Sequence, residues 1–271
     1  KKMSDQAQTI SPKTLSERLA VSALPDELSN LAQAFNGALD RMEDAYKQLE
    51  AFNADVAHEL RTPLANLIGE TQVALSRERS APEFESVLQS NLEELDRLRS
   101  IINDMLFLAR CDQGEAATSL VHTLIADEVQ KTIEFFEFVL DEMQMSVQVT
   151  GDVDARSMIE TALFRRALTN LVQNAIQHSP AGARIIISID ARQKDVQVAV
   201  SNPGDPIEQR HLPRLFDRFY RVDTSRRDNG AHGHGLGLAI VKAIALMHGG
   251  TAFALSAQGL TTIGFTIGKT N

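Results

Sequence analysis

The sequence predicts two kinds of domain in one chain: an all-α helical hairpin that forms a dimeric four-helix bundle, followed by an α+β two-layer sandwich. In the first part, apolar residues recur at three- and four-residue spacing over two segments longer than an average globular helix. Only a short polar stretch, residues 77–81, separates these segments. After a polar linker, short strand-like runs are mixed with helical ones, as in an α+β domain.

The hairpin is expected from two long amphipathic helices. The first runs from Pro25 to about Leu75, and the acidic residues Asp26 and Glu27 that follow the proline are typical of a helix start. The second begins near Pro82 and carries its apolar stripe as far as Ala109. One such hairpin leaves its stripe without a partner, so two copies are expected to pair as a homodimer.

A small, polar, non-periodic stretch, residues 113–119, is interpreted as the linker to a second domain, residues 120–271. Alternation and β-branched residues predict strands in that domain, and apolar periodicity predicts helices. The expected strands are 146–150, 184–190, 196–201, 251–256 and 262–267, and the expected helices are 126–143, 159–178 and 236–248.

Composition excludes several classes of function. The net charge of -9 argues against a nucleic-acid-binding surface, which requires a basic stripe. The single cysteine, Cys111, excludes an intramolecular disulfide framework and a cysteine-rich zinc site. No apolar run is long enough to span a membrane.

His58 is a candidate nucleophile on the first long helix. A histidine on a helix is by itself compatible with a solvated surface residue, and that interpretation stays open. Thr62 follows four residues later on the same face. Pro63 leaves the carbonyl of Glu59 without its helical partner, so we expect a kink within a turn of His58. A neutral imidazole is a competent nucleophile near neutral pH.

Asn170 and Asn174 lie one turn apart on one face of a predicted helix. Amide oxygens suit Mg²⁺, although two surface amides are the simpler interpretation. Gly233 and Gly235 precede the predicted helix 236–248 and Gly237 lies in its first turn, where backbone N–H groups can approach phosphates. His232 and His234 suggest a metal site, but no third ligand is evident.

These segments resemble the sequence boxes of bacterial sensor histidine kinases. Phe52–Leu64, with its core His-Glu-Leu-Arg-Thr-Pro, resembles the H-box, and 170–178 the N-box. Residues 200–207 resemble the G1 box, 215–221 the F-box and 233–238 the G2 box. The resemblance implies a second domain of the histidine kinase, gyrase and chaperone ATPase type. It implies autophosphorylation of His58 from Mg-ATP and transfer of the phosphoryl group to an aspartate of a response regulator.

The resemblance also implies roles for individual residues. His58 is the phosphoacceptor, Glu59 its acid/base partner, and Thr62 positions water when the enzyme dephosphorylates the regulator. Asn174 holds Mg²⁺. The residues implied for ATP are Asn170, Asn174, Gln177, His178, Asn202, Gly204, Tyr220, Arg221, Gly233, Gly235, Leu236, Gly237 and Leu238. Asn202 replaces the usual aspartate that accepts the adenine amino group, and Pro206 replaces a glycine; an Asn carbonyl can still accept that bond.

Two further resemblances indicate the subgroup. Leu24–Asn36 resembles the second half of a HAMP relay module, which implies a partial HAMP segment over 1–45 and a dimerisation and phosphotransfer domain over 46–112. It also implies transmembrane and sensor segments upstream, with this portion facing the cytoplasm at a bacterial inner membrane. Residues 90–110, Asn202 and Pro206 are similar to the heavy-metal kinases of the copper and silver type.

Two other functions share part of this pattern. Chaperone and repair ATPases carry the same nucleotide boxes, but they lack an acceptor histidine. A signalling dimer could bind nucleotide without turnover, although His58, Asn174 and the glycines 233–237 argue against it.

Overall fold

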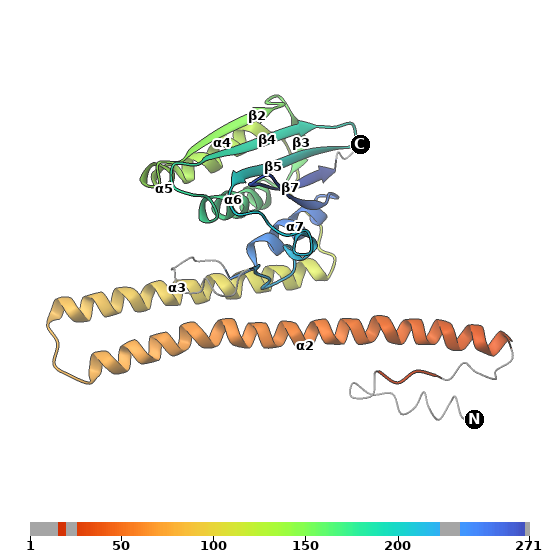
Figure 1. Ribbon diagram of the computed structural model, residues 1–271, viewed down its shortest axis with the longest axis horizontal. Helices are drawn as coiled ribbons and strands as arrows, with labels where there is room; N and C mark the ends of the chain where they lie inside the picture. The colour runs from red at the N-terminus through yellow and green to blue at the C-terminus, as the bar shows by residue number, and fades with distance from the viewer. Residues whose placement is uncertain (1–15, 20–25, 223–233, 269–271) are drawn as a thin grey trace. The chain divides into compact units, whose positions relative to one another are not determined.

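The structure is a computed structural model that describes residues 16–19, 26–222 and 234–268. The chain divides into two compact units, residues 1–91 and 92–271. Helix α3 (Ala81–Asp112) continues from the first unit into the second (Figure 1). None of the helices in the described residues is long and apolar enough to cross a bilayer.

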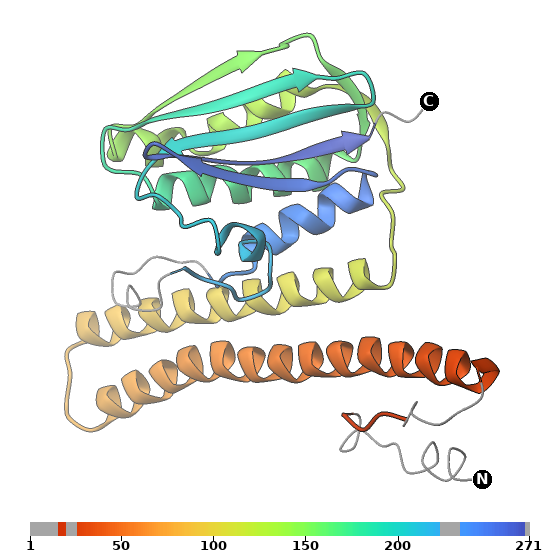
Figure 2. The ribbon, with the colours of Figure 1, turned by 45° about the vertical axis from the view of Figure 1, so that its right-hand side comes forward.

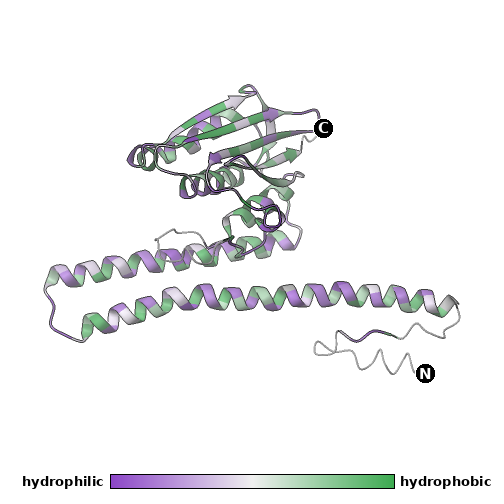
Figure 3. Ribbon diagram, in the orientation of Figure 1, coloured by the Kyte–Doolittle hydropathy of each residue, from purple (hydrophilic) through white to green (hydrophobic). Residues whose placement is uncertain are grey.

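The first unit is built on helix α2 (Asp26–Leu75), which is 50 residues long. The helix passes without interruption through residue 45, where the sequence predicts a domain boundary, and through Pro63. Hydrophobic residues recur along both α2 and α3 (Figure 3). Several of them are exposed in the single chain, as expected for a helix pair that needs a partner: Leu64, Ile68, Val73, Leu75, Phe84 and Leu88.

A capping box begins α3. The Ser80 backbone N–H and hydroxyl both donate to Glu83 Oε2, each at 2.8 Å. In this Ser-x-x-Glu segment the Glu83 carboxylate satisfies the Ser80 N–H, a group that the helix start leaves unpaired. These bonds lower the pKa of Glu83. The helix therefore begins at Ala81.

A short segment, residues 16–19, lies against the N-terminal part of α2. The side-chain amide of Asn36 bonds both backbone groups of Leu19, at 2.9 and 3.0 Å. Arg18 pairs with Asp40 at 2.7 Å and with Glu43 at 2.5 Å. Hydrogen bonds from Lys47 and Arg18 lower the pKa of Glu43. These contacts hold residues 16–19 against α2, the helix that carries His58.

The second unit contains a five-stranded sheet of order β2-β4-β5-β7-β6, in which only β2 and β4 are parallel (Figure 2). Its strands are β2 (Ser146–Gly151), β4 (Arg184–Ala191), β5 (Asp195–Pro203), β6 (Ala252–Ala257) and β7 (Leu260–Gly268). A separate antiparallel pair joins β1 (Val121–Leu124) to β3 (Arg156–Ile159).

Helices α4 (Ile125–Phe135), α6 (Thr161–Gln177) and α7 (Gly237–Met247) cover one face of the sheet (Figure 2). Between the layers, the rings of Phe164 of α6 and Phe265 of β7 pack edge to face, with their centres 5.7 Å apart. Alternate strand residues complete this core: Ile185, Ile187, Ile189, Val196, Val198, Val200, Ile263 and Ile267. The predicted combination of helical region and α+β sandwich is confirmed.

Three details of the prediction were wrong. The expected single helix 126–143 is interrupted at Phe136, which leaves the helical region at φ -97°, ψ 1°, and α5 (Glu137–Glu142) follows. The pair β1 and β3 was not predicted, because four-residue strands give too little alternation to detect. Ile159 ends β3 and does not begin a helix, so α6 starts at Thr161.

Candidate functional site

His58 lies exposed in the middle of α2. The Thr62 hydroxyl donates to the carbonyl oxygen of His58 at 3.3 Å, so the threonine lies on the histidine face as predicted. Pro63, buried, has no N–H to offer Glu59. The His58 carbonyl therefore accepts a side-chain hydrogen bond, and the Glu59 carbonyl lacks the backbone N–H that a helix normally supplies. This is the local feature that separates His58 from an ordinary helix histidine.

Glu59 is half-buried, whereas His58 is exposed. Neighbouring helix positions point about 100° apart, so the two side chains diverge from the backbone. A carboxylate role at the imidazole therefore requires rotation of the long Glu59 side chain. The assignment of Glu59 stays a prediction.

Asn170 and Asn174 are both half-buried on helix α6. The Asn170 amide donates to the carbonyl of Arg166 at 2.9 Å, which fixes its orientation. Its Oδ1 then faces the start of α7, where a Cβ on Gly237 would lie 2.7 Å away. The N-box and G2 segments are thus in direct contact, and a Cβ at residue 237 would require the Asn170 amide to shift.

The G1 segment meets the C-terminal end of α6. A Cβ on Gly204 would lie 2.6 Å from the backbone oxygen of His178, so glycine is required there. Asn202 is 3% exposed and lies within the last residues of β5. Its Nδ2 donates to the carbonyl of Pro203 at 3.2 Å. This bond directs Nδ2, and therefore leaves Oδ1 as the acceptor end of the amide.

The F-box and G2 segments are joined through their backbones. The Phe219 N–H donates to the carbonyl of Gly235 at 2.9 Å, and both residues have positive φ, 60° and 69°. The Tyr220 hydroxyl bonds His211 Nδ1, and the Arg214 guanidinium lies 4.3 Å from the tyrosine ring centre. The Tyr220 side chain thus contacts two nearby residues of the same segment, His211 and Arg214.

The remaining residues predicted to bind ATP differ in their exposure to solvent. Gln177, His178 and Arg221 are exposed, Leu238 is half-buried, and Leu236 is 1% exposed and packs in the core. Gly233 and His232 lie outside the described residues. In the part of the chain that the structure describes, no group of three His, Cys, Asp or Glu side chains could hold a metal ion.

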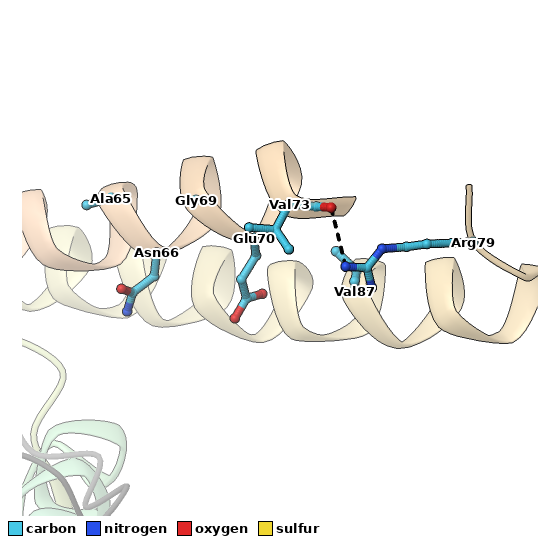
Figure 4. Close-up of a pocket in the computed structure, with 7 residues that line it drawn as sticks. All are labelled: Ala65, Asn66, Gly69, Glu70, Val73, Arg79 and Val87. Carbon is cyan, nitrogen blue, oxygen red and sulfur yellow. Dashed lines mark hydrogen bonds between the residues drawn. The ribbon is translucent and has the colours of Figure 1, made fainter. Parts of the chain in front are cut away.

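Two open cavities lie away from these residues. One, of about 430 Å³, lies between α2 and α3 and is lined by Ala65, Asn66, Gly69, Glu70, Val73, Arg79 and Val87 (Figure 4). Arg79 closes its end by donating to the carbonyl of Val73 at 3.3 Å. The other, of about 470 Å³, lies beside β6 and is lined by Leu212, Pro213, Phe216, Lys242, Leu246 and residues 251–254.

Sequence reasoning missed a set of polar residues that organise the second unit. His248 is 8% exposed, bonds the carbonyl of Ile244 through Nδ1 and accepts from the Glu160 N–H at 3.1 Å. Glu160 in turn accepts from the Thr118 and Ser119 N–H groups of the linker. A histidine without a motif gave no signal for this role.

Three family models match the chain in succession. The HAMP domain matches residues 1–44, the His Kinase A (phospho-acceptor) domain 48–114, and the histidine kinase-, DNA gyrase B- and HSP90-like ATPase 159–270. The chain belongs to the sensor histidine kinases. The H-box lies inside the second match, and the N, G1, F and G2 boxes all lie inside the third.

Curated relatives agree with this assignment. The chain is 44% identical over 254 residues to the sensor histidine kinase CusS of Escherichia coli, an alignment that covers 94% of the chain and 52% of CusS. It is 40% identical to the sensor protein CzcS of Cupriavidus metallidurans, covering 93% of the chain and 52% of CzcS. The chain thus spans about half the length of these curated relatives.

Solved structures share the fold. Histidine kinase ThkA in complex with response regulator protein TrrA superposes with a TM-score of 0.67 at 23% identity, over 84% of this chain and 64% of that one. Acinetobacter baumannii histidine kinase AdeS gives a TM-score of 0.63 at 22% identity, over 79% of this chain and 98% of that one. At these identities the likeness supports the fold.

Proposed function

We propose that this protein phosphorylates itself on His58 with ATP and passes the phosphoryl group to an aspartate of a response regulator. One observation carries the proposal. The N-box, G1, F-box and G2 segments, far apart in sequence, meet around the C-terminal half of α6 and the start of α7. The same chain presents an exposed histidine beside a helical proline. ATPases without an acceptor histidine lack the second feature.

In the proposed reaction, an imidazole nitrogen of His58 attacks the γ-phosphorus of ATP. A nitrogen–phosphorus bond forms, the bond from that phosphorus to the β,γ-bridging oxygen breaks, and ADP leaves. The imidazole proton passes to a base, and Glu59 is the carboxylate proposed for this role. Catalysis of such transfers consists mainly of positioning and charge stabilisation.

The residues around α6 suit a magnesium nucleotide. Asn174 offers an amide oxygen, a ligand type that Mg²⁺ accepts. Bound Mg²⁺ supplies neutralisation of phosphate charge. Gly237 at the N-terminus of α7 lets backbone N–H groups approach phosphate oxygens. The Asn202 Oδ1 is suited to accept a bond from the adenine amino group. Other residues in the proposed binding set are Asn170, Gln177, His178, Gly204, Tyr220, Arg221, Gly233, Gly235, Leu236 and Leu238.

We also propose that the active form is a homodimer. The support is the row of exposed apolar side chains on α2 and α3, such as Leu64 at 52%, Ile68 at 50% and Leu88 at 62%. The cavity in Figure 4 opens on the same helix pair. Burying such residues against a second hairpin would complete a four-helix bundle.

The response regulator is proposed to receive its phosphoryl group at the His58 turn and to be dephosphorylated there as well. Thr62, bonded to the carbonyl of His58, lies where it could position a water molecule. The histidine kinase ThkA, which shares the fold, was solved in complex with such a regulator, TrrA. The HAMP match supports attachment to a membrane. The similarity of residues 90–110 to copper- and silver-type kinases supports a heavy-metal signal.

Incubation with γ-labelled ATP tests the proposed function. The wild-type chain is expected to acquire acid-labile label, and a His58→Gln variant is expected to acquire none. His122→Gln is a matched control, because His122 is also exposed but carries no motif. Labelling that persists in His58→Gln would refute the proposal. ATP turnover without label on the wild-type chain would favour a conformational ATPase.

A further inference from the structure

The cavity beside β6 has walls from α7, from β6 and from the segment between β5 and α7. Helix α7 contributes Lys242 and Leu246, which lie one turn apart on one face of the helix. The F-box contributes Phe216, and β6 contributes Phe253. The volume of about 470 Å³ is in the range of sites that bind small molecules. The cavity can therefore hold a small organic molecule.

The sequence of β6 explains why this space is open. β6 is an edge strand of the sheet that the structure describes. Residues 252 and 254 are alanines, whose short side chains project to the same face of the strand. The ring of Phe253 lies over its cross-strand partner Gly264, where a Cβ would be 2.7 Å from Cζ of the ring. The cavity is thus built into the fold at this sheet edge.

The walls of the cavity are mostly apolar. Leu246 is 60% exposed and Phe253 is half-buried, so both offer apolar surface to a ligand. Among the described residues that line the cavity, Lys242 is the only charged one. Lys242 is exposed, and none of the ion pairs within the described part of the chain includes it.

We propose that this cavity binds a small monocarboxylic acid with an aliphatic body. The body packs against Phe216, Leu246 and Phe253, and the ammonium of Lys242 pairs with the carboxylate. Apolar contact provides most of the affinity, because each CH₂ group removed from water strengthens binding about three- to fourfold. A partly exposed ion pair adds only about two- to fivefold. This site goes beyond the proposed function, since neither ATP nor His58 takes part in it.

The single ammonium decides the class of ligand. A carboxylate carries one negative charge, which one lysine can balance. A nucleotide triphosphate carries several negative charges and needs further cations, which the described lining does not offer. A cationic ligand is repelled by Lys242, and a neutral one leaves the ammonium without a partner. The charge and the apolar walls together therefore favour a monocarboxylate.

Calorimetric titration of the 271-residue chain with hexanoate, octanoate and decanoate tests the apolar contact. The titrations are made below the concentrations at which these acids form micelles. Affinity is expected to rise about three- to fourfold for each added CH₂ group. Decanoate is expected to bind equally well in the presence of saturating Mg-ATP, because the cavity lies away from the residues proposed for the nucleotide.

Two substitutions assign the binding to this cavity. Lys242→Met keeps an apolar stem and removes the charge, so octanoate affinity should fall about two- to fivefold without a fall for 1-octanol. Ala254→Phe fills the cavity and excludes about two or more CH₂ groups, so decanoate affinity should fall about tenfold or more. Lys194→Met and Ala257→Phe are the matched controls, because both residues are exposed and neither lines the cavity. Both controls are expected to bind like the wild-type chain.

Phenylalanine is favourable in strands, so Ala254→Phe is expected to fold. If thermal unfolding shows that this variant is destabilised, Ala252→Leu on the same face of β6 takes its place. Equal decanoate affinity in the wild-type chain and the cavity-filling variant places the acid elsewhere and overturns the site. Octanoate affinity that Lys242→Met leaves unchanged overturns the pairing with the carboxylate.

Competition with nucleotide gives a further decision. A decanoate dissociation constant that rises in proportion to the Mg-ATP concentration shows that the acid occupies the nucleotide site, and this result also overturns the proposal. A wild-type chain that takes no label on His58 overturns the proposed function and leaves the titrations without ATP unaffected. The two proposals therefore fail on different measurements.

Discussion

Replacing Gly237 with alanine tests whether the N-box and G2 segments form one site. A Cβ at this position would lie 2.7 Å from Asn170 Oδ1, closer than carbon and oxygen normally approach. The amide of Asn170 is anchored to the Arg166 carbonyl at 2.9 Å, so it cannot turn aside without losing that bond. We therefore expect Gly237→Ala to displace Asn170 and lower affinity for ATP about tenfold, or ~1.4 kcal/mol.

The same change is expected to leave global stability nearly unaltered. Loss of the Asn170 hydrogen bond costs about 1 kcal/mol. Alanine in place of glycine in a helix contributes up to about 1 kcal/mol in the opposite direction. The free energy of unfolding should therefore stay within about 1 kcal/mol of the wild-type value. A loss of binding without a loss of stability would place the effect at the site.

A double-mutant cycle isolates the contact. Asn170→Ala removes both the obstacle and the hydrogen bond, so Gly237→Ala should no longer cost that bond in the Asn170→Ala background. The expected coupling in unfolding free energy is about 1 kcal/mol, measured by urea titration, with ATP affinity measured by calorimetry on all four proteins. Additivity within about 0.5 kcal/mol, the behaviour of independent sites, would refute the reasoning.

Three further outcomes test the fold and its ionisable groups. Ile187→Ala should lower the free energy of unfolding by about 2–5 kcal/mol, because Ile187 is fully buried. Ile186→Ala on the opposite face of the same strand should cost clearly less, and equal losses would contradict the sheet orientation. The capping bonds lower the pKa of Glu83, so its contribution is present above the unfolded pKa and is lost as pH falls through the folded pKa. In acid titrations monitored by unfolding, Glu83→Gln should remove that component, and an unchanged profile would contradict it. Burial raises the pKa of the Cys111 thiol, so iodoacetamide should modify the folded chain more slowly than the denatured one, and equal rates would rule out protection.

The elements with strong periodicity were predictable from sequence. The long helices, the buried strands and α7 follow from spacing of apolar residues alone. The helix break at Phe136 was not predictable, because the residues on both sides keep a helical pattern. The short pair β1 and β3 depends on tertiary pairing, which no local pattern encodes.

The candidate site was likewise only partly predictable from the sequence. The sequence identified which segments carry polar and glycine residues, but not which backbone atoms they meet. The requirement for Gly204 arises from the His178 carbonyl, and that carbonyl belongs to a segment more than twenty residues away along the chain. The engagement of Tyr220 with His211 is likewise a tertiary contact. The ion pairs of Asp104 with Arg166 and of Asp112 with Arg218 are tertiary contacts too. In the sequence, only the spacing of the two aspartates, about two turns of one helix, could be seen.

Arg166 contacts both α3 and a residue of the proposed nucleotide site, through different atoms. Its guanidinium binds Asp104 of α3, and its backbone carbonyl anchors Asn170. The carbonyl is held by the hydrogen bonds of α6, so removal of the Asp104 charge should leave Asn170 in place. Asp104→Asn is therefore expected to leave the affinity for ATP unchanged. An Asp104→Asn chain that lost affinity for ATP, measured by calorimetry, would contradict this separation and would show that the contact of Arg166 with α3 also shapes the nucleotide site through α6.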